Sequence, residues 1–217
     1  MSAVDVGSGP SGVAYDPAKG EIFVTNYDDS TVSVLSDATD KVIAIVDGFL
    51  GPSGVAYDSA KGELFASSSG STTLPGSVSV ISDATNAVIA TVSLADAGSV
   101  AYDSVKGELF VVTPNTNSTS IISDATNSVI ATKAAGPGPF EIAYDSAKGE
   151  MFVSNPSANI ITILSDSTVV STTSKSGTSA LQPSYLVIIA VNGAVVGMLG
   201  VLAATRGQRR RTPTAEA

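Results

Sequence analysis

The 217-residue chain contains no cysteine, no histidine and no tryptophan. Without cysteine, neither a disulfide nor thiol chemistry is available. The lack of His and Cys also removes the usual ligands of transition metals, so acid–base or metal chemistry would depend on Asp and Glu alone. These absences argue against an enzyme, and we expect no catalytic residue, no metal site and no cofactor.

Positive charge is also scarce, and it is unevenly placed. The net charge is −9, and residues 1–185 hold seven lysines against 19 acidic residues. An acidic chain is a poor partner for nucleic acid, so none is expected. An acidic body followed by a basic tail points to a membrane boundary. All the arginines lie in the last twelve residues: Arg206, Arg209, Arg210 and Arg211.

One sequence motif occurs four times. It consists of Ala-Tyr-Asp, two variable residues, Lys-Gly-Glu, and then an apolar pair that ends in Phe. Its tyrosines are Tyr15, Tyr57, Tyr102 and Tyr144, spaced by 42, 45 and 42 residues. A period in the low forties is typical of a solenoid or a propeller. Each motif predicts two strands joined by a hairpin turn, with glycine at the position where the backbone needs a positive φ.

The rest of each repeat predicts two more strands. Thr31–Leu35 alternates between apolar and polar residues, a Ser-Asp-Ala-Thr turn follows, and Lys41–Val46 is again apolar. Related turns begin at Ser82, Ser123 and Ser165. No run before residue 185 has helical periodicity. The predicted fold is therefore all-β: a β-propeller of four four-stranded blades over residues 1–174, with the first strand of each blade innermost.

The second strands make a resemblance specific. Phe23–Asn26 reads Phe-Val-Thr-Asn and Phe152–Asn155 reads Phe-Val-Ser-Asn, beside the repeated Pro-Ser-Gly-Val-Ala-Tyr-Asp. Over roughly residues 3–173 the chain resembles the YVTN family of β-propeller repeats. The resemblance implies an archaeal surface-layer or cell-surface protein. It concerns the fold more than any activity, since propellers host many functions. The second and third repeats depart from the motif, reading Phe-Ala-Ser-Ser and Phe-Val-Val-Thr.

The start of the chain falls inside a repeat. Ala3-Val4-Asp5 matches the end of a last strand, 42 residues before Ile45-Val46-Asp47. This segment either pairs with the fourth blade and closes a ring, or belongs to a longer array. We expect an open arc, completed by upstream repeats or by a second copy. No basic and apolar leader precedes the repeats, so we interpret the chain as the C-terminal part of a longer exported protein.

Three loops and two repeated features are candidate sites. The acids of Tyr27–Ser30 lack the spacing of a calcium loop and predict a polar turn. Ser67–Gly76 predicts a flexible or binding loop, and Asn117 begins an Asn-Ser-Thr glycosylation pattern on an exposed loop. The repeated Tyr and Phe residues predict packing between blades, with glycan stacking an alternative for the tyrosines. The Lys-Gly-Glu tips are expected to be solvated, and Asp16 and its equivalents to cap those turns.

After Ser165 the repeat pattern weakens. Thr168–Thr173 can form a final strand, and residues 175–184 predict a Ser/Thr-rich stalk. Leu186–Thr205 carries no charge and, as a helix, would span about 30 Å. We therefore expect a transmembrane helix at 185–205, with Tyr185 and the four arginines as interfacial anchors. Gly193 and Gly197 form a small-xxx-small pattern that could pair the helix with another copy.

The arginines also predict orientation. The positive-inside rule places residues 206–217 in the cytoplasm and the propeller outside the cell. The chain would then be a single-pass protein of the cell membrane. The function expected is a membrane-anchored, non-catalytic extracellular propeller with a surface-layer, adhesion or ligand-binding role. Expected partners are the membrane, further copies of the chain, other surface proteins or glycans. Two alternatives stay open: a tail-anchored scaffold or sensor facing the cytosol, and a propeller enzyme of lactonase or lyase type.

Overall fold

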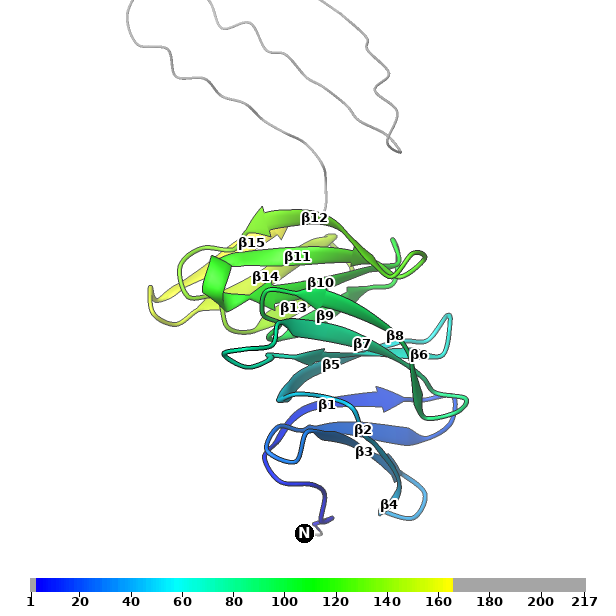
Figure 1. The fold of residues 1–217 in the computed structure, drawn as a ribbon. Coiled ribbons are helices and arrows are strands. Elements are labelled where there is room, and N and C mark those ends of the chain that lie inside the picture. The colour runs from blue at the N-terminus through cyan, green and yellow to red at the C-terminus, as the bar shows by residue number, and fades with distance from the viewer. Residues whose placement is uncertain (1–2, 166–217) are drawn as a thin grey trace, which may run out of the picture. The chain divides into compact units, whose positions relative to one another are not determined.

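The computed structural model describes residues 3–165, which fold into four antiparallel sheets of consecutive strands (Figure 1). Sheet 1 contains β1 (Pro10–Asp16), β2 (Glu21–Asn26), β3 (Thr31–Ser36) and β4 (Lys41–Val46). Sheet 2 contains β5 (Pro52–Asp58), β6 (Glu63–Ser68), β7 (Gly76–Ser82) and β8 (Ala87–Leu94). Sheet 3 contains β9 (Val100–Asp103), β10 (Glu108–Thr113), β11 (Ser118–Ser123) and β12 (Ser128–Ala134). Sheet 4 contains β13 (Ile142–Asp145), β14 (Glu150–Asn155) and β15 (Ile160–Ser165).

The predicted all-β meander is confirmed, and strands within each sheet pair in chain order. The helical content of residues 3–165 is one 3-10 turn, η1 (Pro114–Thr116). No helix of this described part is long and apolar enough to cross a membrane. The predicted strand at Thr168–Thr173, the stalk at 175–184, the transmembrane helix at 185–205 and the tail at 206–217 lie outside the described residues.

The hairpin between the first two strands of each sheet follows from local chemistry. The Asp16 carboxylate accepts the backbone N–H of Ala18 at 2.8 Å, which closes the turn as an aspartate cap. Gly20 then adopts φ +65°, where a Cβ atom would meet Asp37 Oδ1 at 2.5 Å. The expected cap and the expected glycine are both confirmed. The same cap is made by Asp58, Asp103 and Asp145.

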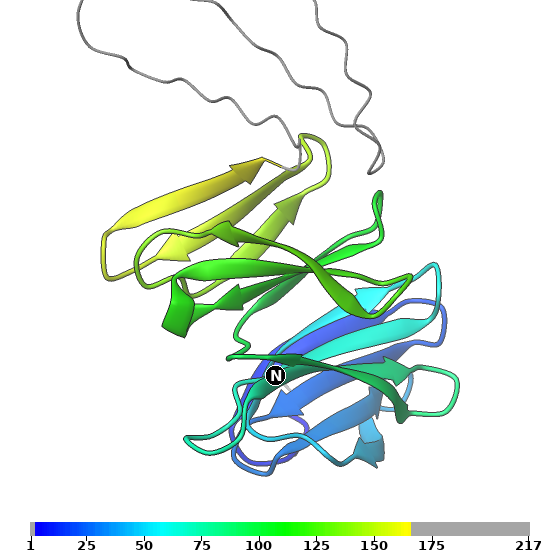
Figure 2. The ribbon, with the colours of Figure 1, turned by 45° about the horizontal axis from the view of Figure 1, so that its top comes forward.

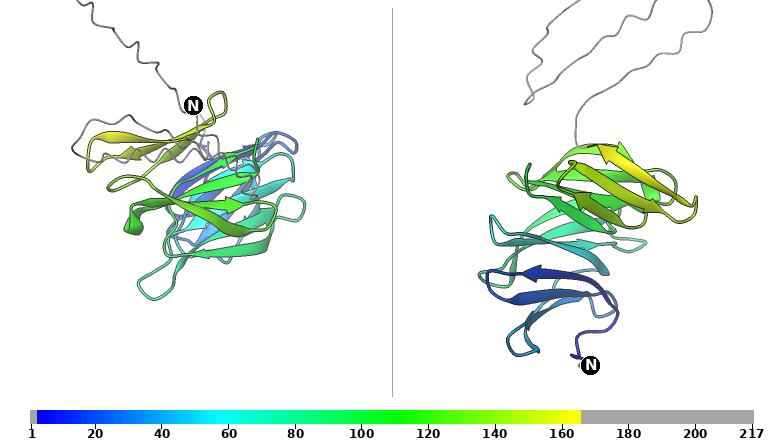
Figure 3. Two further views of the ribbon diagram at one scale, coloured as in Figure 1. Left: turned by 90° about the horizontal axis from the view of Figure 1, so that it is seen from above. Right: turned by 180° about the vertical axis from the view of Figure 1, so that it is seen from behind.

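The first strands of successive sheets lie side by side, β1 against β5, β5 against β9 and β9 against β13. This arrangement confirms the expectation that the first strand of each unit is innermost. The sheets thus follow one another in chain order, with sheets 1 and 4 at the two ends (Figures 2 and 3). Three apolar clusters join sheet 1 to sheet 2, sheet 2 to sheet 3, and sheet 3 to sheet 4.

The repeated phenylalanines belong to these clusters, as the sequence predicted. Phe23, Phe65 and Phe110 are completely buried. Each projects from the second strand of one sheet toward the next sheet, where leucine, valine and isoleucine side chains receive it. Phe152 occupies the same position in sheet 4 but is only half-buried. The core is therefore made between sheets rather than within any one of them.

The chain start lies against its own sheet. The Gly9 carbonyl accepts the N–H of Tyr27, and the Ser8 carbonyl accepts the N–H of Asp28. Ala3-Val4-Asp5 was expected to be the end of a strand, but these residues form no strand. Within residues 3–165 no extensive packing joins sheet 1 to sheet 4, so the described sheets do not close into a ring. The backbone of Ser8 and Gly9 instead bonds to the nearby β2–β3 turn.

Candidate functional site

A cleft of about 630 Å³ runs along the beginnings of the four inner strands. Each sheet contributes the same segment of its repeat. These segments are Ser11–Val13, Ser53–Val55, Gly98–Val100 and Phe140–Ile142. The cleft therefore arises from the stacking of repeats.

In sheets 1 and 2 one hydroxyl each holds the cleft wall to the next sheet. The Thr25 hydroxyl accepts the N–H of Gly12 at 2.7 Å and donates to the carbonyl of Ser53 in the next sheet at 3.1 Å. Ser67 does the same, accepting from Gly54 at 2.8 Å and donating to Gly98 at 2.5 Å. The glycine is required here, because a Cβ on Gly12 would lie 2.6 Å from the Ser53 carbonyl oxygen. The glycine of the Pro-Ser-Gly motif thus allows the backbones of neighbouring sheets to pack closely.

The polar side chains of the cleft lie at positions where the sequence departs from the repeat. The position of Gly12 and Gly54 is occupied by Ser99 in sheet 3 and by Glu141 in sheet 4. The Ser99 hydroxyl donates to Glu141 Oε2 at 2.6 Å, which orients the carboxylate at the cleft. Glu141 has room because no further inner strand packs beside it in the described part of the chain.

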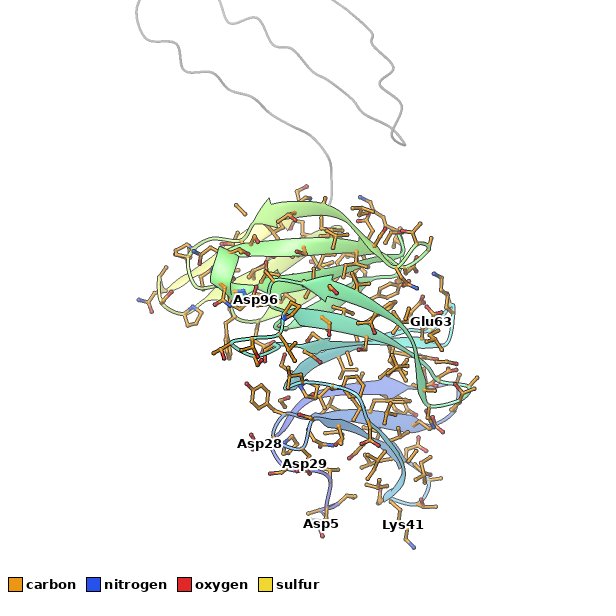
Figure 4. All side chains as sticks on the ribbon, in the orientation of Figure 1. Asp5, Asp28, Asp29, Lys41, Glu63 and Asp96 are labelled. Atoms are coloured by element: carbon orange, nitrogen blue, oxygen red, sulfur yellow. The ribbon has the colours of Figure 1, made fainter. Side chains whose placement is uncertain are left out.

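A second carboxylate lines the cleft from the loop between β8 and β9. Asp96 is 6% exposed, and its Oδ2 atom accepts the N–H of Asn115 at 2.7 Å. Its Oδ1 atom is buried without a hydrogen-bond partner among the described residues. A buried carboxylate oxygen left without a donor is costly. Figure 4 places Asp96 among the loops at the cleft end of the strands.

The cleft lining has acidic and aromatic character. Among residues 3–165 it contains the two carboxylates of Asp96 and Glu141 and no lysine or arginine. Tyr27 and Phe140 also line it and are 47% and 63% exposed, which leaves aromatic surface accessible. Within residues 3–165 no three acidic side chains gather as a metal site. The arrangement favours a ligand that carries positive charge and hydrogen-bond donors.

The opposite ends of the strands carry a different polar cluster, which joins neighbouring sheets. The Tyr102 hydroxyl donates to Asp124 Oδ2 at 2.7 Å, both within sheet 3. Lys61 of sheet 2 reaches the same aspartate, with Nζ 3.2 Å from Oδ1 and 2.6 Å from the backbone carbonyl. Tyr57, Asp83 and Lys19 repeat this arrangement between sheets 1 and 2.

This cluster adds to one expectation. The Lys-Gly-Glu tips were expected to be solvated, and Lys19 and Lys61 are exposed, but both are also ion-paired to the next sheet. Face-to-face packing places the Lys19 tip against the β7–β8 turn and the Lys61 tip against the β11–β12 turn, a relation that spacing along one chain does not reveal. Glu63 belongs to the same tip, and burial raises the pKa of its carboxyl above the ordinary value.

The surroundings of the tyrosines in this cluster raise the pKa of their hydroxyl groups. Burial, followed by hydrogen bonding to Asp124 and the influence of Asp58, raises the pKa of Tyr102 well above its ordinary value. Burial likewise raises the pKa of Tyr57, which interacts with carboxylates of its own and the preceding sheet. These shifts stem from packing between sheets. Figure 4 shows Glu63 and Asp96 at opposite ends of the strands, so the perturbed groups lie away from the cleft.

The predicted site residues have different outcomes. Asn117 is exposed and ends η1 with φ +51°, while its Oδ1 atom accepts the N–H of Gly138 at 2.8 Å. Its glycosylation stays a prediction. In the Tyr27–Ser30 turn, Asp29 accepts the N–H of Ser8 at 2.7 Å. The other candidates lie outside the described residues: Tyr185, Gly193, Gly197, Arg206, Arg209, Arg210 and Arg211.

Asp96 and Glu141 were not singled out from the sequence. The available signal was departure from the repeat, since an acid replaces the glycine of Gly12 and Gly54 at Glu141. Asp96 likewise stands where sheet 2 has Gly51. A search for residues that recur once per unit discards these positions, although a unique site must be built from them.

No protein-family model and no curated protein matches the chain. Two solved structures resemble the fold. One is hydrazine synthase from Kuenenia stuttgartiensis, with a TM-score of 0.60 and 16% identity, over 66% of this chain and 43% of that one. The other is a functionally unknown protein from Desulfotomaculum acetoxidans, with a TM-score of 0.63 and 20% identity, over 74% and 53%. The chain thus spans about half of each, and the likeness concerns the fold alone.

Proposed function

We propose that this chain is a non-catalytic binding protein of the cell surface, a YVTN-like β-propeller arc carried outside the membrane by a helix at 185–205. The propeller assignment is supported by the four repeats and by inner strands that lie side by side. The observation that carries the binding role is the acidic cleft built on the two residues that break the repeat, Asp96 and Glu141. Its ligand is a small molecule with an ammonium group, such as an amino sugar.

Three features support that ligand class. The cleft has two carboxylates without a compensating lysine or arginine, so it attracts a cation. Asp96 is nearly buried at the cleft, and a carboxylate attracts an ammonium group more strongly there than in water. Tyr27 and Phe140 add aromatic surface, which attracts cations and packs against sugar rings. The lining pairs no nucleophile with a histidine or thiol, which supports binding rather than catalysis.

The ligand class is tested by calorimetry with glucosamine and with glucose as the uncharged match. The full-length chain should bind glucosamine more tightly than glucose, since only glucosamine places an ammonium group among carboxylates. Glu141→Gln and Asp96→Asn should each weaken glucosamine binding by about tenfold, the loss of one charge-assisted hydrogen bond. Asp40→Asn, on the exposed β3–β4 turn away from the cleft, is the matched control. Equal binding of the two sugars, or no effect of Glu141→Gln, would contradict the assignment.

The membrane anchor is tested separately, by fractionation of cells that express the chain behind an export signal. Full-length protein should sediment with membranes and resist extraction by carbonate, because twenty uncharged residues insert as a helix. Removal of residues 185–217 should release the repeats into the soluble fraction. Protease added to intact cells should digest the repeats but leave the basic tail. A soluble full-length protein would refute the anchor and leave the cleft assignment standing.

A further inference from the structure

The interfaces between neighbouring sheets share one apolar arrangement, and the first two also share an ion pair. At each one, an apolar face from the second and third strands of one sheet meets an apolar face on the first and second strands of the next. A lysine of the first sheet pairs with an aspartate of the second, as Lys19 with Asp83 and Lys61 with Asp124. A row of four sheets leaves one half of this interface unused at each end.

Sheet 4 presents the first half, and its exposure shows that nothing among the described residues covers it. Ile161 and Ile163 are 57% and 56% exposed. Their equivalents in the preceding sheets are at most 3% exposed: Val32, Val34, Val78, Val80, Thr119 and Ile121. In β14, buried and half-buried residues alternate, whereas the equivalent strands β6 and β10 are buried almost throughout. Alternation of this kind marks a sheet with one open face.

Sheet 1 presents the second half. Val13 and Tyr15 are 66% and 50% exposed, whereas Val100 and Ile142, which are equivalent to Val13, are each 8% exposed. Asp37 accepts the Tyr15 hydroxyl at 2.9 Å, as Asp83 and Asp124 accept theirs, but it is exposed. No lysine of a preceding sheet reaches Asp37 within residues 3–165.

We propose that the chain associates head to tail, so that sheet 4 of one copy packs on sheet 1 of another and reproduces the contact between neighbouring sheets. A second copy is the occupant that the surfaces specify, because one chain carries both halves of the interface. Two copies joined at both ends would bring together eight sheets, within the range of known propellers. The inference goes beyond the proposed function and does not depend on the cleft having a ligand.

The repeated contacts predict individual pairs across this boundary. Lys148 is the equivalent of Lys19 and Lys61; its Nζ atom lies 5.9 Å from the centre of its own Phe152 ring. In a second copy it meets Asp37, the equivalent of Asp83 and Asp124. The Ser154 hydroxyl accepts the N–H of Glu141 at 3.0 Å, as Thr25 and Ser67 accept theirs. Its proton is then available to the Ser11 carbonyl of the other copy.

The apolar part of the interface is tested by sedimentation velocity of the full-length chain in mild detergent. Ile161→Glu with Ile163→Glu should raise the dissociation constant for self-association by at least tenfold, about 1.4 kcal/mol, because it places charge on a face that must desolvate. Ile130→Glu is the matched control. Ile130 is 52% exposed, but its position is exposed in all three described fourth strands, at Ile43 and Ile89 as well, and so belongs to no interface among them.

The polar part is tested by charge exchange. Lys148→Glu and Asp37→Lys should each weaken association, and the double variant should restore it, since the ion pair is rebuilt in reverse. Pairing through the expected helix at 185–205 would not show this rescue. The Gly197→Ile variant measures how much of the self-association comes from that helix. A carbodiimide should link Lys148 to Asp37 between isotopically distinct copies. A monomer at all concentrations, association unchanged by the Ile161 and Ile163 substitutions, or association that depends on Gly197 alone would overturn the proposal.

Discussion

Phe65→Ala is expected to lower the free energy of unfolding by about 3–5 kcal/mol, as for other large aromatic residues removed from a core. Phe65 is completely buried between sheets 2 and 3 and stacks on Tyr102, with ring centres 5.6 Å apart. Its removal opens a cavity that rigid sheets on both sides cannot fill. Urea unfolding of the full-length chain, followed by tyrosine fluorescence or circular dichroism, measures the loss.

Phe152→Ala supplies the comparison from the same position in sheet 4. Because Phe152 is half-buried, its replacement should cost less than half as much as that of Phe65, provided the protein is dilute enough to be monomeric. Under conditions that favour self-association, the two losses should approach each other, since the second copy would bury Phe152. Equal losses in the monomer would show that sheet 4 is already covered, against the exposure of its face.

Asp103→Ala should lower the free energy of unfolding by about 2–3 kcal/mol, as expected when hydrogen bonds to a charged, buried acceptor are lost. Asp103 is completely buried, and its Oδ1 atom accepts the N–H groups of Val105 and Lys106 at 2.8 and 3.3 Å. Alanine leaves both donors without a protein partner. The same denaturation measurement records the effect.

Asp145→Ala is the matched variant for this cap. Asp145 accepts the N–H groups of Ala147 and Lys148 at 2.9 and 3.3 Å, nearly the same geometry, but it is only half-buried. Water can replace the carboxylate there, so we expect a loss of about 1 kcal/mol or less. A loss as large as that of Asp103→Ala would mean that the turn itself, and not its burial between sheets, determines the cost.

Both comparisons depend on the same feature, which is that stability here comes from contacts between successive sheets. Phe65 and Asp103 belong to sheets with neighbours on both sides, whereas Phe152 and Asp145 belong to a terminal sheet. A repeat array of this kind behaves as a row of similar units stabilised by nearest-neighbour interfaces. The two terminal surfaces are therefore the least satisfied parts of the described structure, which is the basis for the proposed head-to-tail association.

The sequence by itself determined the local structure. Alternating apolar residues identified the strands, and the repeat of Tyr15 at 42–45 residues identified the four units. The Asp16 cap and the positive φ of Gly20 were also predicted, because both arise from contacts within a few residues of one turn. Such features depend on backbone geometry and short-range hydrogen bonds, which a sequence pattern reports directly.

Only the tertiary structure decided what the repeated residues face. The sequence did not show that Lys61 reaches Asp124, because the two lie 63 residues apart in different units. Nor did it show that Asp96 and Glu141 line one cleft, since they come from different sheets and interrupt the repeat rather than form it. The register of one sheet on the next results from packing of apolar faces, a long-range effect. That register brings these side chains together, and it leaves Ile161 and Val13 uncovered at the two ends of the row.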